Sequence, residues 1–279
     1  MINSKTISAI RQHSTDDLRK ASREVYVETE NELRKALFAA SSIAARSSAN
    51  TTALVKLSIV ITRDLFISKT VNIPSVGGIA IRSINGSIIA PYHDGDAFPL
   101  FRWLRDTKDA SAIVSATLGL SITDVSLIGV EGKGKEFSAL LAIDQVSTAS
   151  DLIFNLRIEG CSTQIWHAAT PQYLIDAPFA PGAPDFGPRL AHSTVVNNLS
   201  GWGIRGNFQW SVIAGNVIGP LDFPFLLGTS VSNNVSSFLG TMSISTSSDG
   251  GRNVITGNAN TVAPVGFVSP STVVANNVL

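Results

Sequence analysis

The sequence has little of several things on which common protein classes depend. Its 279 residues include one cysteine, Cys161, which excludes an intrachain disulfide and a cysteine-based metal cluster, so a buried structural thiol is expected. Nowhere do 18 apolar residues follow one another, and no early apolar run is long enough for a secretory signal. We therefore expect a protein that is made and kept soluble, without membrane binding. The formal net charge of zero also gives no field that would attract nucleic acid.

Charged residues are scarce in the second half of the chain, where no lysine follows Lys135 and no glutamate follows Glu159. From Cys161 to the end, the charged residues are Asp176, Asp185, Arg189, Arg205, Asp222, Asp249 and Arg252. In a soluble monomer, about a quarter of the residues are normally charged. This predicts either that partner chains cover this part or that its surface is built from serine, threonine and asparagine.

The stretch from Thr15 to about Arg46 predicts a helix. It is rich in helix formers, contains no glycine or proline, and has Ser14 or Thr15 as a cap. Its apolar residues follow the helical period only loosely and form no sustained heptads. Two roles are left open for this helix, a cap on the body that follows and a coiled coil.

From residue 51 onward the apolar residues alternate with polar ones, as in "LVKLSIVITRDLFISKTVNIP" and "GGIAIRSINGSIIAP", and glycine, asparagine and proline separate the short segments. This predicts an all-β body. We expect the segment near 93–112 to interrupt it as an insertion, a short helix or tight loop with Asp96 as a cap ahead of Pro99. The proline-rich segment 177–190 predicts a loop or a linker.

A five-fold repeat organises the C-terminal part. An asparagine recurs in "VVNNL", "IAGNV", "VSNNV", "ITGNA" and "VANNV", at Asn198, Asn216, Asn234, Asn258 and Asn277. An aliphatic residue stands three positions before each asparagine, and another follows it directly. The residue just before it is always asparagine or glycine, which predicts a turn because both tolerate left-handed backbone conformations. We expect the aliphatic residues on both sides of the turn to face inward.

Turns at spacings of 18, 18, 24 and 19 residues are what a parallel β-solenoid requires. Each coil returns the chain to the same place, about 4.8 Å further along the axis, so equivalent residues stack. The aliphatic residues would form a continuous core, and the five asparagines a ladder of hydrogen-bonded amides. The sequence therefore predicts a structural role for these asparagines.

The order of an N-terminal helix, "TRDLFISKTVNIPSVGGIAIRSING", "DVSLIGVEG" and coils punctuated by Asn and Gly resembles the right-handed parallel β-helices of pectate-lyase-like proteins. Among these it is most similar to tail spikes, tail fibres and related decoration proteins of bacteriophage virions. The resemblance implies a right-handed parallel β-helix preceded by an α-helix, and a homotrimer. The predicted regions are a helical capping or attachment region (1–50), a first part of the β-helix (51–176), the proline-rich segment (177–190) and trimer-forming coils (191–279).

Family members that cleave polysaccharide generally use a pair of carboxylates, and a glycosidase pair needs acids roughly 5 to 10 Å apart. The candidate pairs are Asp94 with Asp96, Glu131 with Glu136, and Asp124 with Glu159 if their coils stack. None of the pairs lies in a diagnostic motif, and "HDGD" at 93–96 is better explained as a turn than as a calcium loop.

Other site chemistry is not indicated. The four histidines are scattered along the sequence, so no zinc site is predicted. No "GxSxG" motif occurs, and "EGKGKEF" lacks the length and the final Ser or Thr of a phosphate-binding loop. The sequence therefore predicts neither a metal nor a cofactor.

The aromatic stretch "GWGIRGNFQW" at 201–210 is the best candidate for ligand binding. Sugar rings stack on exposed indoles, and an arginine beside an aromatic ring can hold an acidic sugar. The predicted carbohydrate-binding residues are Trp202, Arg205 and Trp210. The alternative, which an oligomeric solenoid favours, is that these aromatic residues pack in the core or between subunits.

The residues and the resemblance together imply a structural or adhesive bacteriophage protein that is assembled into the virion in the host cytoplasm. Its N-terminal region would attach to other virion proteins, and its partner outside the particle would be host surface polysaccharide. Whether it belongs to the tail or the head is left open. The alternative is a polysaccharide depolymerase, a hydrolase or lyase, on the same scaffold. A bacterial surface or secreted β-helix is a third hypothesis, which the missing signal peptide disfavours.

Overall fold

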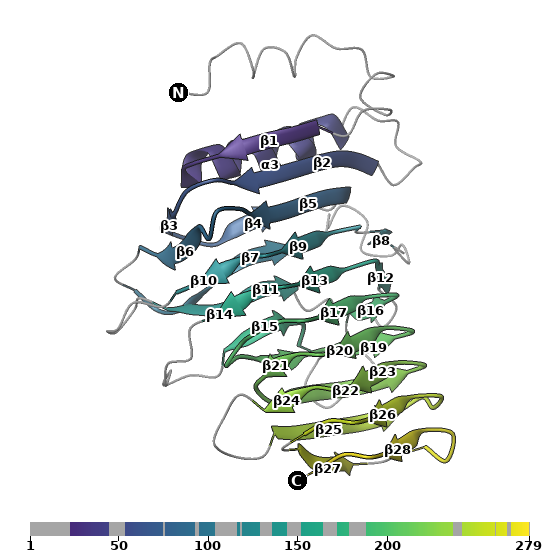
Figure 1. Cartoon of the computed structure of the whole chain (residues 1–279). Coiled ribbons are helices and arrows are strands. Elements are labelled where there is room, and N and C mark those ends of the chain that lie inside the picture. Colours follow the sequence, from purple (N-terminus) through teal and green to yellow (C-terminus); the bar gives the residue numbers. More distant parts are fainter. Residues whose placement is uncertain are drawn as a thin grey trace.

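The chain winds as a stack of coils built from short strands, with one helix at the N-terminal end of the described part (Figure 1). The computed structural model describes residues 23–44, 54–74, 76–92, 95–103, 116–117, 119–128, 136–143, 152–163, 172–178, 188–236, 242–259, 261–266 and 269–278. Every strand pairing in these residues is parallel.

Three sheets run along the stack. Sheet A consists, in spatial order, of β1 (Arg23–Val27), β2 (Leu54–Ile61), β5 (Gly77–Ser83), β9 (Ser121–Thr123), β13 (Arg157–Glu159), β17 (Thr194–Val196), β20 (Val212–Ala214), β23 (Ser230–Ser232), β26 (Val254–Thr256) and β28 (Val273–Ala275). Sheet B consists of β3 (Leu65–Ile67), β6 (Ile88–Pro91), β10 (Ser126–Leu127) and β14 (Ser162–Thr163), with β21 (Val217–Ile218) and β24 (Val235–Ser236) paired further along.

Sheet C has two rows of strands that meet at β22. One row consists of β4 (Val71–Ile73), β7 (Phe98–Trp103), β11 (Phe137–Ile143), β15 (Tyr173–Asp176), β18 (Gly203–Arg205), β22 (Leu221–Leu227), β25 (Met242–Asp249) and β27 (Thr261–Gly266). The other row consists of β8 (Ala116–Thr117), β12 (Leu152–Phe154), β16 (Arg189–Ala191) and β19 (Asn207–Gln209).

Each coil passes from sheet A to B to C and back to A, which is a parallel β-helix. Crossover connections between parallel strands wind right-handed in nearly all proteins. The predicted all-β fold, a right-handed parallel β-helix preceded by an α-helix, is confirmed. Below, each coil is named by its strand in sheet A.

The core is a set of stacked columns, and the most complete column is aliphatic throughout. Its members lie in register across sheet A: Val25, Ile59, Ile81, Ile122, Ile158, Val195, Ile213, Val231, Ile255 and Val274. From Ile59 to Ile255 each is at most 1% exposed, whereas Val274 in the last coil is 40% exposed. β-Branched side chains suit this position because they pack well on a pleated surface, and burying each contributes about 1.5–3 kcal/mol.

The helix prediction for Thr15 to Arg46 is wrong over Arg23–Val27. The sequence "REVYV" alternates and pairs in parallel with β2, so it extends sheet A by one strand. The helix α3 (Glu30–Ala44) begins after Thr29, whose Oγ1 accepts a 3.3 Å hydrogen bond from the Glu32 backbone N–H. That interaction caps the helix N-terminus.

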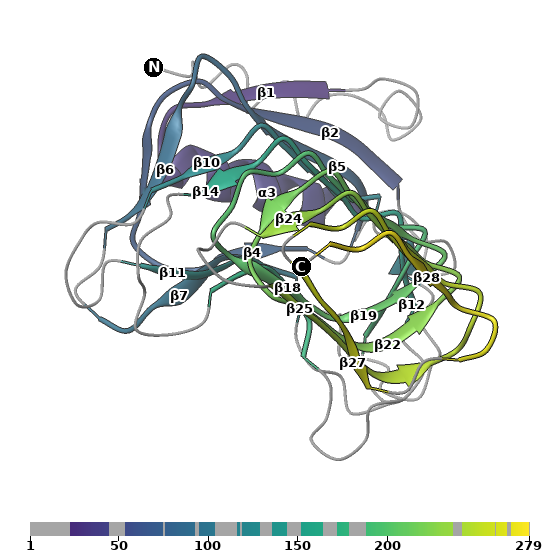
Figure 2. The same ribbon diagram turned by 60° about the horizontal axis from the view of Figure 1, so that its bottom comes forward.

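The helix closes the end of the core. Its Leu33, Leu37 and Ala40 are buried in the same hydrophobic cluster as the sheet columns, and it contacts strands β1 to β4. Figure 2 shows α3 lying across the end of the coil. No helix in the described part of the chain is long and apolar enough to cross a membrane.

Another sequence prediction needs correction. The predicted insertion near 93–112 contains β7, whose Leu100, Phe101 and Trp103 are buried, so this part belongs to sheet C rather than to an added helix or loop. Residues 93–94 and 104–115 lie outside the described residues.

The proline-rich segment 177–190, predicted as a loop or a linker, follows β15 and reaches into β16, and its residues 179–187 lie outside the described residues. On either side of it in the sequence, β13 pairs with β17, so the β-helix continues past this segment.

The five repeat asparagines stack inside the turn between sheets A and B. Asn198 Nδ2 donates a 2.8 Å hydrogen bond to Asn216 Oδ1, which also accepts from the Asn198 backbone N–H at 3.0 Å. The same pair of bonds joins Asn216 to Asn234, Asn234 to Asn258, and Asn258 to Asn277. Each Nδ2 also donates to a backbone carbonyl of the preceding coil. The buried amides thus satisfy one another along the axis.

The prediction that the aliphatic residues on both sides of the ladder face inward is wrong for one of the two sides. The residues that stand three positions before each asparagine do belong to the core column. Those directly after it point outward, and Leu199, Val235 and Val278 are 55%, 37% and 62% exposed. The reason is geometric: the ladder asparagine points inward at the corner, so the alternating chain turns the next side chain to the surface.

Candidate functional site

Three charged residues form a row on the outer face of sheet C. Asp176 ends β15, Arg205 ends β18, and Asp222 is the second residue of β22, and the three lie in register on neighbouring strands. Neighbouring strands are about 4.8 Å apart. We call this set the Asp–Arg–Asp row.

Arg205 is held in place by contacts on two sides. Its Nε donates a 2.8 Å hydrogen bond to Asp176 Oδ1, and its Nη2 lies 2.6 Å from the same oxygen. Its guanidinium lies 4.6 Å from the centre of the Tyr173 ring. The side chains of Arg205 and Asp176 keep 31% and 24% of their surface exposed. A ligand at the surface can therefore reach a guanidinium whose orientation is already fixed.

The scarcity of charge makes this row stand out. Seven charged residues occur from Cys161 to the end of the chain, and three of them are in this one row. Charges that serve only solubility are normally dispersed over the surface. Carboxylate oxygens accept hydrogen bonds and a guanidinium donates them, so the row suits a ligand rich in hydroxyl groups.

A second arginine–aromatic pair lies beside the row. The Arg189 guanidinium is 4.8 Å from the centre of the Phe225 ring. Asn207 is on the strand between them. It lies on β19 in register with Arg189 of β16, and β19 pairs on its other side with β22, which contains Phe225. Asn207 is fully buried, and neither its Oδ1 nor its Nδ2 has a hydrogen-bond partner among the residues that the structure describes. A buried amide without partners costs about 1–3 kcal/mol, and such groups are rare in native structures.

The predicted carbohydrate-binding residues lie in three different settings. Trp202 is 5% exposed and belongs to the core, so its indole is not available to a surface sugar. Arg205 is in the Asp–Arg–Asp row. Trp210 is 50% exposed and lies at the corner between sheets C and A, five residues after Arg205 on the same coil. The sequence "GWGIRGNFQW" thus crosses from the core to the surface within one coil.

Trp210 belongs to a stack of rings along the corner. Its ring lies 5.4 Å from that of His192 at an interplanar angle of 25°, and His192 lies 5.9 Å from Phe154 at 19°. On the other side the indole lies over Gly228, where a Cβ atom would be 2.6 Å from Trp210 Cδ1. The indole is therefore fixed between two coils, and its outward edge accounts for the exposed half.

Of the three predicted acid pairs, only Asp124 with Glu159 lies wholly within the described residues. These two residues are on neighbouring coils that stack, Glu159 is in register with Thr123, and its carboxylate accepts a 2.7 Å hydrogen bond from Arg157 Nε. Asp96 is exposed ahead of β7, and Glu136 is half-buried before β11. Asp94 and Glu131 lie outside the described residues. No group of three or more histidine, cysteine, aspartate or glutamate side chains in the described residues is placed to hold a metal ion.

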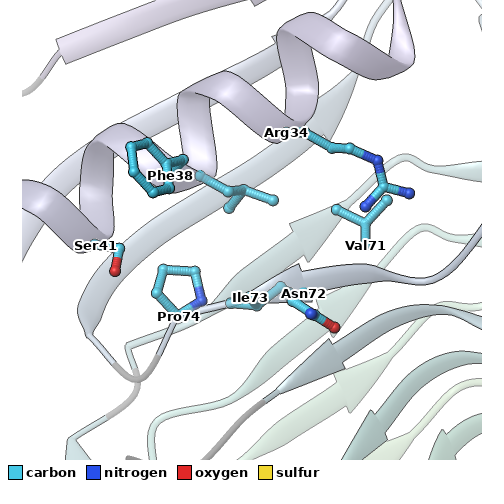
Figure 3. Close-up of a pocket in the computed structure, with 8 residues that line it drawn as sticks. Arg34, Phe38, Ser41, Val71, Asn72, Ile73 and Pro74 are labelled. Atoms are coloured by element: carbon cyan, nitrogen blue, oxygen red, sulfur yellow. The ribbon is translucent and has the colours of Figure 1, made fainter.

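A groove lies between α3 and β4 (Figure 3). Its volume is about 370 Å³, and its lining is mostly apolar, with Phe38, Ile73 and Pro74 on its walls. Arg34 fixes the helix beside it by donating a 2.9 Å hydrogen bond from Nη1 to the Thr70 carbonyl. The groove has no acidic residue in its lining and is remote in the stack from the Asp–Arg–Asp row.

Comparisons with known proteins add little to this geometry. No protein-family model matches the chain, and no curated protein matches its sequence. Among solved structures, a double variant of pectate lyase from Xanthomonas campestris is similar at a TM-score of 0.34 and 12% identity, over 85% of this chain and 66% of that chain. The chain therefore spans just under two thirds of that enzyme's length. At this TM-score the likeness carries no conclusion about activity.

Asp176 and Asp222 are absent from the predicted site residues, because the predicted acid pairs all come from the part of the chain before residue 160, where acids are frequent. A signal was present in their spacing. Asp222 follows Arg205 by about one coil, and Arg205 follows Asp176 by one coil plus the proline-rich connection. Rarity of charge and coil spacing together would have placed the three residues in one row.

Proposed function

We propose that the chain is a structural or adhesive component of a bacteriophage particle, of the tail spike, tail fibre or decoration type, and that it binds host surface polysaccharide through the outer face of sheet C. The observation that carries the binding proposal is the concentration of rare charges in the Asp–Arg–Asp row. The parallel β-helix supports it as a scaffold, because it presents equivalent side chains at fixed intervals along a rigid surface.

The bound polysaccharide would contact several coils at once. The carboxylates of Asp176 and Asp222 would accept hydrogen bonds from sugar hydroxyls, and the guanidinium of Arg205 would donate to ring or hydroxyl oxygens. The exposed edge of Trp210 would add an apolar contact at the corner of the same coil. In this proposal, the N-terminal region attaches to other virion proteins, and the functional unit is a homotrimer within the virion.

Two experiments test the two halves of this proposal. Antibodies raised against the purified chain should label bacteriophage particles in electron micrographs, and labelling of no particle would remove the virion assignment. The purified chain should bind capsule or lipopolysaccharide from bacterial hosts, and Asp176→Asn and Asp222→Asn should each weaken that binding. Unchanged binding by both variants would show that the polysaccharide binds outside the Asp–Arg–Asp row.

A depolymerase is the second candidate function, and one observation favours it. Asp176 and Asp222 lie two strands apart, at about 10 Å between backbones. This is near the upper end of the separation used by inverting glycosidases, about 6.5–9.5 Å between carboxyl groups. Release of oligosaccharide that is lost in Asp176→Asn and in Asp222→Asn would establish cleavage. Tight binding without release would leave the adhesive role.

A further inference from the structure

A stripe of exposed aliphatic residues runs along the last five coils, directly after the asparagine ladder. Its members lie side by side through parallel bridges and strand pairing: Leu199, Val217, Val235, Ala259 and Val278. Leu199, Val235 and Val278 are more than one-third exposed, and the two others are half-buried. We call this set the aliphatic stripe. Single exposed valines are ordinary on protein surfaces, but a contiguous row marks a site of association.

The same column is mixed in earlier coils. Ile88, Ser126 and Ser162 hold the equivalent positions, and the two serine hydroxyls hydrogen-bond to each other at 2.9 Å. Ser162 is bridged to Leu199, where the aliphatic stripe begins. From Leu199 onward every member of the column is aliphatic, so the uninterrupted apolar row is confined to the last five coils.

The neighbouring outward column on sheet A is also free of charge. It consists of Val196, Ala214, Ser232, Thr256 and Ala275, in register across the strands from β17 to β28. Identical copies of a charged corner would repel one another. None of the described residues in these two columns carries a charge that would oppose contact with its own copy.

We infer that the aliphatic stripe is the surface on which a second copy of this chain packs, with the two stacks lying side by side. The stripe repeats an apolar group about every 4.8 Å over five coils. A partner that matches this repeat along its whole length is another copy of the stripe itself. Val235 is the third of the five residues, so it meets the partner's Val235 whether the two stripes run in the same or in opposite directions. This inference rests on the proposed homotrimer, for which it names the contact surface, and it does not depend on polysaccharide binding.

The test compares two valines of nearly equal exposure. Val235 is 37% exposed on the stripe, and Val254 is 40% exposed on the outer face of sheet A. In light scattering, the wild-type chain should have at least twice the 29.4 kDa mass of one chain. Val235→Lys should shift the mass to that of a single chain, because it brings two ammonium groups together at the centre of the contact. Val254→Lys should leave the oligomer intact, and circular dichroism should show that both variants keep the wild-type fold.

A cross-linking experiment tests the same contact without disrupting the oligomer. Val235→Cys should form a disulfide-linked dimer on mild oxidation, since the native Cys161 is buried and does not compete. Val254→Cys should not form the dimer. A monomeric wild-type chain, or an oligomer that Val235→Lys leaves unchanged, would overturn the inference. Polysaccharide binding is measured separately and would stand or fail by itself.

Discussion

The side-chain oxygen of Asn233 occupies the space above Gly257 on the next coil, where a Cβ atom would lie 2.5 Å from Asn233 Oδ1. The same relationship joins Asn197 to Gly215 at 3.0 Å and Asp124 to Gly160 at 2.5 Å. All these residues have positive φ. The turn between sheets A and B thus alternates, coil by coil, between a residue that leans over its neighbour and a glycine that leaves room for it.

Replacing the glycine in such a pair should be costly for two separable reasons. Gly257→Ala introduces a side chain at φ 66° and a clash with Asn233, so we expect the free energy of unfolding to fall by about 2 kcal/mol or more. Gly86→Ala is the matched control, because Gly86 has φ 69° but nothing within 4 Å of the added Cβ. Urea denaturation should show a smaller loss there, of about 1 kcal/mol.

Removing the Asn233 side chain as well should recover part of the stability that Gly257→Ala loses. The double variant with Gly257→Ala and Asn233→Gly keeps the positive-φ cost and loses the clash, so it should be more stable than Gly257→Ala alone. If the two substitutions were simply additive, the contact between these residues would not be the cause.

The asparagine ladder should tolerate change at its end better than in its middle. Asn216→Ala removes the acceptor of two hydrogen bonds from Asn198, at 3.0 and 2.8 Å, in a fully buried position. Because each buried donor left unpaired costs about 1–3 kcal/mol, we expect a loss of about 3 kcal/mol or more in thermal or urea denaturation. Asn277→Ala should cost less than half as much, since water reaches that half-buried end. Equal losses at both positions would contradict a ladder sealed from solvent.

Cys161 stands one coil before the ladder and should make stability depend on alkaline pH. Burial raises the pKa of its thiol from 9.0 to about 12. Below pH 9 the thiol is protonated in both the folded and the unfolded chain, so its contribution to stability is fully present. Above pH 9 only the unfolded chain ionises, so the free energy of unfolding should fall by about 1.4 kcal/mol per pH unit until about pH 12.

The control for this prediction is Cys161→Val, because Val125 holds the equivalent position in the preceding coil. The stability of wild type relative to Cys161→Val should decline as pH rises above 9, and iodoacetamide should modify the thiol only after unfolding. A pH-independent difference, or fast modification of the folded chain, would show that the thiol is accessible.

Several features of the fold could be predicted because they depend on repetition. The spacing of Asn198, Asn216 and Asn234 reflects the length of a coil, and a solenoid has few other ways to use it. The strand at Arg23–Val27 could not be predicted, because its helix formers are overridden by pairing with β2. Tertiary pairing likewise turned Phe98–Trp103 into a strand. The outward direction of Leu199 depends on how the corner bends, which the spacing does not contain.

The candidate site was harder to predict than the fold. Arg205 and Trp210 are predicted from the aromatic stretch that contains them, but the burial of Trp202 depends on which residue of "GWG" faces the core. Asp176 is separated from Arg205 by a connection of irregular length, so its place beside Arg205 appears only when the coils are stacked. Sequence spacing therefore predicts the scaffold, whereas the candidate site appears only from the register between coils.

The most direct test of the proposed function is the affinity for host capsule or lipopolysaccharide, compared between Arg205→Met and Arg157→Met. Both arginines bind a carboxylate on the surface, Asp176 in sheet C and Glu159 in sheet A. Such exposed pairs contribute about 1 kcal/mol or less to stability, so both variants should unfold close to wild type. We predict that Arg205→Met weakens polysaccharide binding about tenfold or more, as expected for loss of a charged hydrogen bond, and that Arg157→Met binds like wild type. Equal binding by the two variants, or no binding by the wild-type chain, would contradict the account.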